Sequence, residues 1–293
     1  FWQLRSGASA FLPLLNSNIL FERLLDSRVP GMGHRISPDK SVIIFTQWSS
    51  DWSTQLSPAQ FLSVNDTAGS IYLDDLKKTS RYTEGPEDAR VIYNPEKDEL
   101  NLNFNILTLN GGRQMFEQQI KIFQESNDLK FTKTNPLVEF RHSGGYRAGS
   151  EKNWTPIFIK GELHYVYSIS PLRIVKCEFE NNFSAKDVTK KDITSYKKTC
   201  HVKFNGAAIN SGPQVSALRG GTNWIEFSPG VFFSLGRTFM KKRNFSLYRP
   251  HLIVLKFNID AESGAYSTLI IFQFQSRLPN LTSNCSVFMP KPE

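Results

Sequence analysis

Apolar and polar residues alternate along much of the chain after its first forty residues. The pattern is clearest at Glu99–Leu107, where leucine, phenylalanine and isoleucine alternate with asparagines at positions 101, 103 and 105. A period of two is typical of a β-strand whose two faces meet different surroundings. We therefore predict a strand here, with its asparagines facing water. Shorter apolar stretches of strand length recur as far as residue 275, separated by turn sequences such as Asn-Gly-Gly at 110–112.

The arrangement of these stretches predicts an all-β fold. Segments 156–159 and 163–168 flank Lys-Gly-Glu at 160–162, which indicates a hairpin. The strand-like stretches form roughly five clusters with no helical pattern between them, as in a propeller, barrel or sandwich. The first 34 residues differ, because apolar residues at 19–25 have helical spacing. We predict a single domain over 1–293, with 1–34 as a short helical or extended arm that packs on it.

Composition supports strands and narrows the class of ligand. Aromatic residues make up 13% of the chain, with 23 phenylalanines, and such side chains favour strands. Lysine and arginine number 35 against 27 acidic residues, giving a net charge of +8. The basic residues are scattered, whereas nucleic-acid binding usually needs a compact basic patch. We expect no nucleic-acid partner, and the net charge fits either a solvated basic surface or a small anionic ligand. The basic pairs Lys197-Lys198 and Lys241-Lys242 are expected in loops.

Glycosylation signals and cysteines indicate in which cellular compartment the protein resides. Asn-x-Ser/Thr sequences occur at six positions, namely Asn65, Asn153, Asn182, Asn244, Asn280 and Asn284. They predict a glycoprotein in the lumen of the secretory pathway (Golgi) or outside the cell. The cysteines at 177, 200 and 285 fit no metal site, and either a Cys177–Cys200 disulfide or three reduced thiols is consistent with the spacing. No apolar run is long enough to span a membrane, so any membrane anchor is expected outside the chain shown.

Three segments carry the candidate chemistry, and each lies at the start of a strand-like stretch. They are Glu87-Asp88-Ala89-Arg90; Lys152-Asn153-Trp154-Thr155-Pro156 with the later Tyr167-Ser168-Ile169; and Arg219-Gly220-Gly221-Thr222. A structural ion pair, a solvated turn and a tight glycine turn are the respective alternatives to a functional role. The chain has no phosphate-binding glycine loop, nucleophile elbow or His-Glu-x-x-His motif.

In order and spacing these segments resemble the five-bladed β-propeller superfamily of β-mannoside phosphorylases and hydrolases and the related β-mannosyltransferases. The resemblance covers about residues 35–260 and departs from the pattern at Ala89, where proline is usual, and at Leu172, where histidine is frequent. It implies a five-bladed propeller in which Asp88 transfers the proton. The residues it implies for binding substrate or phosphate are Glu87, Arg90, Lys152, Asn153, Trp154, Tyr167, Arg219, Gly220 and Gly221.

The function that follows is an inverting glycosyltransferase. It would move mannose from a sugar nucleotide, with GDP-mannose as the expected donor, to a mannose-containing glycan. A carboxylate such as Asp88 can accept the proton of the attacking hydroxyl, and cations can bind the phosphates. The alternatives are a β-mannoside phosphorylase or hydrolase, with phosphate as partner in the first case, and an inactive glycan-binding propeller. No cofactor and no metal is expected. The prediction requires Asp88, Lys152 and Arg219 to face one pocket.

Overall fold

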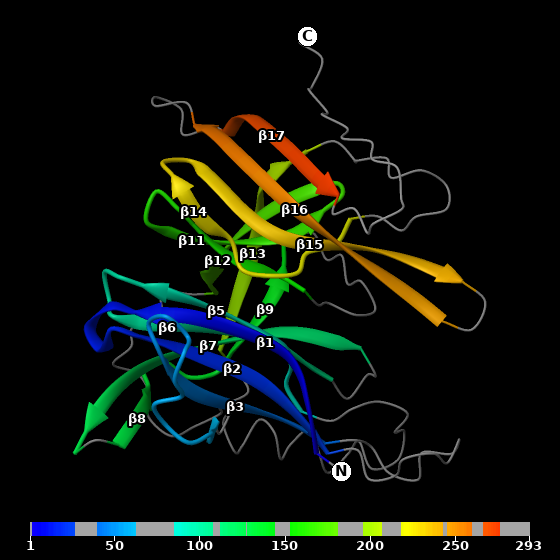
Figure 1. Ribbon diagram of the computed structural model, residues 1–293. Helices are drawn as coiled ribbons and strands as arrows, with labels where there is room; N and C mark the ends of the chain where they lie inside the picture. The colour runs from blue at the N-terminus through cyan, green and yellow to red at the C-terminus, as the bar shows by residue number, and fades with distance from the viewer. Residues whose placement is uncertain are drawn as a thin grey trace. The chain divides into compact units, whose positions relative to one another are not determined.

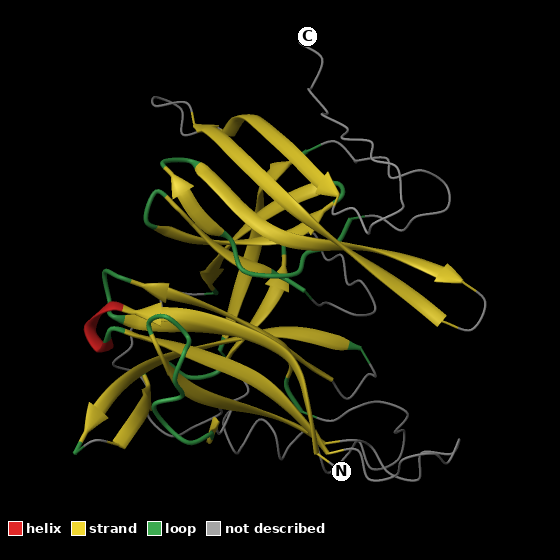
Figure 2. Ribbon diagram, in the orientation of Figure 1, coloured by secondary structure: helices red, strands yellow, loops and turns green. Residues whose placement is uncertain are grey.

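The computed structural model describes residues 2–26, 40–62, 85–107, 112–126, 128–143, 153–180, 196–206, 218–242, 245–259 and 266–275 (Figure 1). Within these ranges every regular element is a strand, except the 3-10 turn η1 (Pro13–Leu15) (Figure 2). The all-β prediction is therefore confirmed. None of the described residues form a helix of the length and apolar character that a membrane crossing requires.

The chain divides into two compact units. Unit 1 comprises Phe1–Lys152 and Cys177–His201, and unit 2 comprises Asn153–Lys176 and Val202–Glu293. The division falls within two strands, β12 (Leu172–Phe179) and β13 (Lys197–Asn205). The single domain over 1–293 stays a prediction.

The first sheet of unit 1 begins at the N-terminus. It contains β1 (Trp2–Leu12), β2 (Ser17–Asp26), β3 (Lys40–Ser49) and β4 (Gln60–Leu62), paired antiparallel in that order. The predicted arm is thus extended, and its helical alternative is wrong. Ile19 and Phe21 are fully buried whereas Leu20 is less so, which is the period of a strand. A short apolar run fits either structure, and pairing with strands on both sides decides between them.

The remaining strands of unit 1 are β5 (Glu87–Asn94), β6 (Glu99–Leu107), β7 (Arg113–Glu125), β8 (Asp128–Lys133), β9 (Val138–His142) and part of β13. They adjoin in the order β13-β9-β7-β6-β5, and β8 pairs with β7. β13 is parallel to β9, and the other pairs are antiparallel. The bounds of β6 are those that the alternation predicted. Its apolar side chains, including Phe104, join Phe21 and Phe45 of the first sheet in one hydrophobic core.

The polar face of β6 is buried as well. Asn101, Asn103 and Asn105 are 2%, 1% and 0% exposed, so the predicted water-facing side is wrong. Alternation shows only that successive side chains point to opposite faces. It does not show whether water or other polar side chains cover the polar face. Buried amides need hydrogen-bonding partners, and the neighbouring strand β7 supplies them here: Gln119 donates to Asn101 and Arg113 donates to Asn105.

Unit 2 contains β10 (Thr155–Ile159), β11 (Glu162–Ile169) and most of β12, followed by β14 (Ile225–Ser228), β15 (Val231–Lys242), β16 (Phe245–Ile259) and β17 (Tyr266–Gln275). The predicted hairpin at 160–162 is confirmed, because β10 and β11 pair antiparallel around Lys160 and Gly161. Both of these residues have positive φ, as a tight two-residue hairpin turn requires. The four strands β14 to β17 form an antiparallel meander. Lys241 and Lys242 lie in β15, so their expected place in a loop is wrong.

A disulfide joins Cys177 in β12 to Cys200 in β13. Of the two interpretations open for the cysteines, this is the one the structure has; Cys285 lies outside the described residues. The bridge closes a loop with a sequence separation of 23 residues. Cross-linking a loop of that length restricts the unfolded chain and stabilises the fold by about 3 kcal/mol.

Candidate functional site

The segment that carries Asp88 enters β5 through a β-bulge. The pairing of β5 with β6 shifts between Glu87 and Arg90, so that Asp88 and Ala89 together lie opposite Phe104. Asp88 has a φ of 51°, which is uncommon for a residue other than glycine. Bulges redirect side chains and occur often beside active sites. In this bulge Asp88 is partly exposed, whereas Ala89 is buried.

Glu87 anchors the bulge through two arginines. Arg23 and Arg113 both form ion pairs with its Oε1 atom, and the Arg113 Nη2 atom lies 2.9 Å from it. Arg113 also donates through Nη1 to Asn105 Oδ1 at 2.8 Å, and Asn105 Nδ2 donates to the Glu87 carbonyl at 3.1 Å. The Glu87 side chain is 12% exposed. Such a nearly buried, multiply bonded carboxylate fixes its neighbour Asp88 in place.

The residues before the bulge are held against β3. The Ser41 hydroxyl donates to the Pro86 carbonyl at 2.5 Å and accepts from Arg23 Nε at 2.9 Å. Gly85 has a φ of 94°, and a Cβ atom there would lie 2.1 Å from the Ser41 carbonyl oxygen. Only glycine permits that approach. The strand β3 therefore helps to position Asp88, although the two are distant in sequence.

The charges of Arg113 and Asp88 interact electrostatically. Burial is the largest influence on its pKa and lowers it; the charges of Glu87 and Asp88 raise it, and the nearby Arg23 lowers it further. An arginine stays protonated under such shifts. Sequence reasoning missed Arg23, Asn105 and Arg113, because only strand pairing brings them to the bulge. No local motif marks them.

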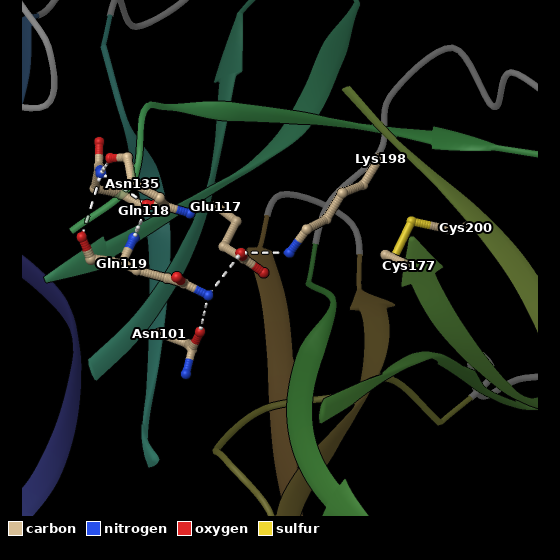
Figure 3. A network of polar contacts seen from close by, with 8 residues as sticks. All are labelled: Asn101, Glu117, Gln118, Gln119, Asn135, Cys177, Lys198 and Cys200. Carbon is tan, nitrogen blue, oxygen red and sulfur yellow. Dashed lines mark hydrogen bonds and ion pairs between the residues drawn. A yellow bond between two sulfur atoms is a disulfide. The ribbon is translucent and has the colours of Figure 1, made fainter. Parts of the chain in front are cut away.

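A buried row of polar residues crosses the same sheet. Arg90, Asn103 and Glu117 are directly paired across β5, β6 and β7, so their side chains share one face. Lys198 reaches Glu117 from β13, with Nζ 2.7 Å from Oε1 (Figure 3). The Lys198 side chain is 10% exposed and that of Glu117 is fully buried. The loop expected for Lys197-Lys198 is wrong, since both residues belong to β13.

In unit 2 parts of two predicted segments lie together, namely Asn153-Trp154-Thr155 and Arg219-Gly220-Gly221. A Cβ atom on Gly220 would lie 3.4 Å from the Asn153 carbonyl oxygen and 3.7 Å from the Thr155 methyl group. Trp224 Nε1 donates to Thr155 Oγ1 at 3.0 Å. Asn153 has a φ of 64°, and within the described part of the chain its buried Oδ1 accepts no hydrogen bond. A buried acceptor of this kind is suited to a donor from a ligand.

The other predicted residues of unit 2 differ in exposure. Trp154 is 1% exposed, and its ring lies 5.1 Å from that of Tyr167 in an edge-on arrangement. Arg219 is exposed, and its backbone forms two 2.9 Å hydrogen bonds with Arg237. Trp154 thus packs inside unit 2, and its contact with a ligand stays a prediction.

The structure leaves the shared pocket untested. Asp88 belongs to unit 1 and Arg219 to unit 2, and Lys152 lies outside the described residues. Convergence of the three therefore stays a prediction.

The two glycines of the third segment are expected to differ in their tolerance of alanine. A Cβ atom on Gly221 would lie 2.2 Å from the Leu235 carbonyl oxygen, to which the Thr222 N–H is bonded at 2.9 Å. Gly221→Ala must displace backbone, and we expect it to destabilise the protein by about 2 kcal/mol in urea unfolding. Gly220→Ala, whose nearest contact would be 3.4 Å, is the control and should stay within about 0.5 kcal/mol of the unmutated protein. Equal stability of the two variants would contradict the close approach at Gly221.

Similarity to known proteins identifies the chain as a glycosyltransferase and assigns it to one family. A family model of glycosyltransferases matches residues 108–276, which is more than half of the chain. Its description is Beta-mannosyltransferases, and the chain belongs to this family.

Curated relatives agree with this assignment. The chain is 26% identical over 203 residues to Beta-mannosyltransferase 1 of Komagataella phaffii (strain GS115 / ATCC 20864), covering 61% of this chain and 29% of the relative. It is 25% identical over 277 residues to Beta-mannosyltransferase 4 of the same strain, covering 87% and 48%. The chain thus spans less than half the length of these relatives.

Proposed function

We propose that this chain is the mannosyl-transferring part of an inverting glycosyltransferase, which uses a sugar nucleotide such as GDP-mannose and a mannose-containing glycan. The observation that carries the proposal is the placement of Asp88. In a chain of the β-mannosyltransferase family, this carboxylate lies at a bulge where Arg113 forms an ion pair with Glu87 and interacts electrostatically with Asp88. A partly exposed acid and a cation that acts on it electrostatically are the two groups that the reaction needs.

In the proposed mechanism Asp88 accepts the proton of the acceptor hydroxyl. The acceptor oxygen bonds to the anomeric carbon from the face opposite the leaving group, and the bond from that carbon to the phosphate oxygen breaks. The nucleoside diphosphate leaves with the bonding electrons, so the configuration is inverted. Arg113 offsets negative charge nearby, as preorganised cations do at phosphates. Arg90, Lys152 and Arg219 are the further cations proposed for the diphosphate, and Glu87 is proposed to position Asp88.

Two finer features belong to the same proposal. The five-bladed propeller is supported by the antiparallel meanders β1 to β4 and β14 to β17, because blades are four-stranded sheets of this kind. Residence in the Golgi lumen or outside the cell is supported by the Cys177–Cys200 disulfide, since disulfides persist in oxidising compartments.

Two parallel incubations of the full chain test the proposal. One contains GDP-mannose and a mannose oligosaccharide, and the other contains mannobiose and inorganic phosphate. We expect GDP and an extended oligosaccharide from the first incubation and no product from the second, as measured by mass spectrometry. Mannose 1-phosphate from the second incubation would identify a phosphorylase instead. Release of free mannose from mannobiose would identify a hydrolase, and binding without product in both would identify an inactive glycan-binding protein.

A further inference from the structure

Aromatic and amide side chains form one row across the sheet of strands β1 to β4 in unit 1. The strand registers place Phe11 opposite Asn18, Asn18 opposite Trp48, and Trp48 opposite Gln55. Directly paired residues of antiparallel strands point to the same face, so these four side chains cross the sheet side by side. The strands β1, β2 and β3 that carry most of the row lie next to one another in Figure 1.

Trp52 extends this row from the turn that follows β3. Its ring centroid lies 6.3 Å from that of Trp48, with the planes tilted by 38°. Trp52 is 42% exposed and Phe11 is 43% exposed. The Trp48 indole is oriented by its Nε1–H, which donates to Thr46 Oγ1 at 2.9 Å. Single exposed aromatic residues are common, whereas exposed apolar side chains that lie next to one another often mark a binding site.

The turn that presents Trp52 is held by hydrogen bonds. Asp51 Oδ1 accepts from the Ser49 hydroxyl at 2.5 Å and from the Ser53 amide and hydroxyl at 3.0 and 2.8 Å. These bonds, the Ser49 hydroxyl first, lower the pKa of Asp51 to about 2, so its carboxylate is charged at neutral pH. Asn18 Nδ2 donates to the carbonyls of Ser49 and Ser50 at 2.9 and 3.0 Å. The surface is thus preorganised, which reduces the entropy lost on binding.

The backbone at Trp52 points to a role for its ring. Its φ is 64°, in the left-handed region that glycine and asparagine adopt readily. A bulky residue there is a genuine outlier, and such strain concentrates at functional positions. The Trp52 N–H donates to the Ser49 carbonyl at 3.0 Å, so the turn itself needs only the backbone of residue 52. The indole is therefore not required for the hydrogen bonding that closes this turn.

We propose that Trp48 and Trp52 form a glycan-binding platform, which holds a mannose-containing oligosaccharide by stacking a pyranose ring on the indoles. One face of a pyranose presents C–H groups, and an aromatic face offers apolar contact area. Its hydroxyl groups need polar partners at the edge of the ring. Exposed polar side chains of the same turn, Asp51, Ser53 and Gln55, supply such partners. Apolar contact with a few placed polar groups is the usual composition of a small-ligand site.

The platform goes beyond the proposed catalytic function, because it binds without reacting. It uses none of the residues assigned to proton transfer or to phosphate. Its test is therefore carried out on the full chain with Asp88→Asn as the background. In that background the ligand is not consumed, and the result does not depend on whether the chain transfers mannose.

The test measures binding of mannotetraose by titration calorimetry, with Trp52→Gly as the decisive variant. Glycine suits the positive φ, so the melting temperature should equal or exceed that of the background protein. Loss of the stacking surface should weaken mannotetraose binding about tenfold or more. Trp52→Phe, which restores an aromatic ring, should recover most of the affinity.

A matched control is Phe123→Ala, since Phe123 is also an aromatic residue of unit 1 and is 37% exposed. We expect its affinity for mannotetraose to equal that of the background protein. The proposal is overturned if Trp52→Gly binds as tightly as the background, if Phe123→Ala loses as much affinity, or if the background protein shows no saturable binding. Absence of mannosyl transfer in the unmutated chain would count against the proposed function only.

Discussion

Asp88→Asn is expected to lower the rate of mannosyl transfer by about 10²- to 10⁴-fold, which is the usual contribution of a positioned proton-transfer group. The asparagine has nearly the shape of aspartate but cannot accept the proton of the acceptor hydroxyl. It also tolerates the left-handed backbone, so the φ of 51° at this position does not threaten the fold. The measurement is the initial rate of GDP release from GDP-mannose with a mannose oligosaccharide as acceptor.

Two controls separate a chemical defect from a structural one. Urea unfolding of Asp88→Asn should match that of the unmutated protein within about 0.5 kcal/mol, because the side chain is not in the core. Asp128→Asn removes an aspartate that is 75% exposed at the start of β8, and it should leave the rate unchanged. Transfer by Asp88→Asn at the unmutated rate would remove Asp88 from the mechanism.

Glu117→Gln is expected to destabilise the protein by about 3–5 kcal/mol, the usual result of removing one charge from a buried pair. The Lys198 ammonium lies 2.7 Å from Glu117 Oε1, and the Lys198 side chain is 10% exposed. The substitution removes the negative partner of this ammonium and leaves it buried. Gln119 Nε2, which donates to Asn101 Oδ1 at 2.9 Å, lies 3.5 Å from the same carboxylate oxygen (Figure 3). The free energy of unfolding in urea is the quantity to compare.

Two further variants show whether burial of the Glu117–Lys198 pair causes the loss of stability. Glu117→Leu combined with Lys198→Met removes both charges, and it should cost far less than the single change. Asp128→Asn breaks the exposed pair with Lys130, where the side chains are 75% and 48% exposed, and should change stability by less than about 1 kcal/mol. If Glu117→Gln were as mild as Asp128→Asn, the pair would not be shielded from water as the structure indicates.

The candidate site was only partly predictable. The cluster Glu87-Asp88-Ala89-Arg90 stood out because charged residues at a strand entrance are conspicuous in a sequence. The two arginines that form ion pairs with Glu87 could not be predicted, since Arg23 and Arg113 come from strands β2 and β7. The bulge was equally hidden, because it depends on how β5 pairs with β6 and not on either strand alone.

Local pattern by itself determined several strands, among them Glu99–Leu107 with its period of two, and the hairpin turn at Lys160 and Gly161. These features depend on neighbouring residues, so the sequence contains what is needed to specify them. Only the tertiary structure decided that Asn101, Asn103 and Asn105 lie inside the protein and that Lys198 pairs with Glu117. The physical reason is that burial and charge pairing depend on which distant strands become neighbours, and alternation along one strand carries no record of its partners.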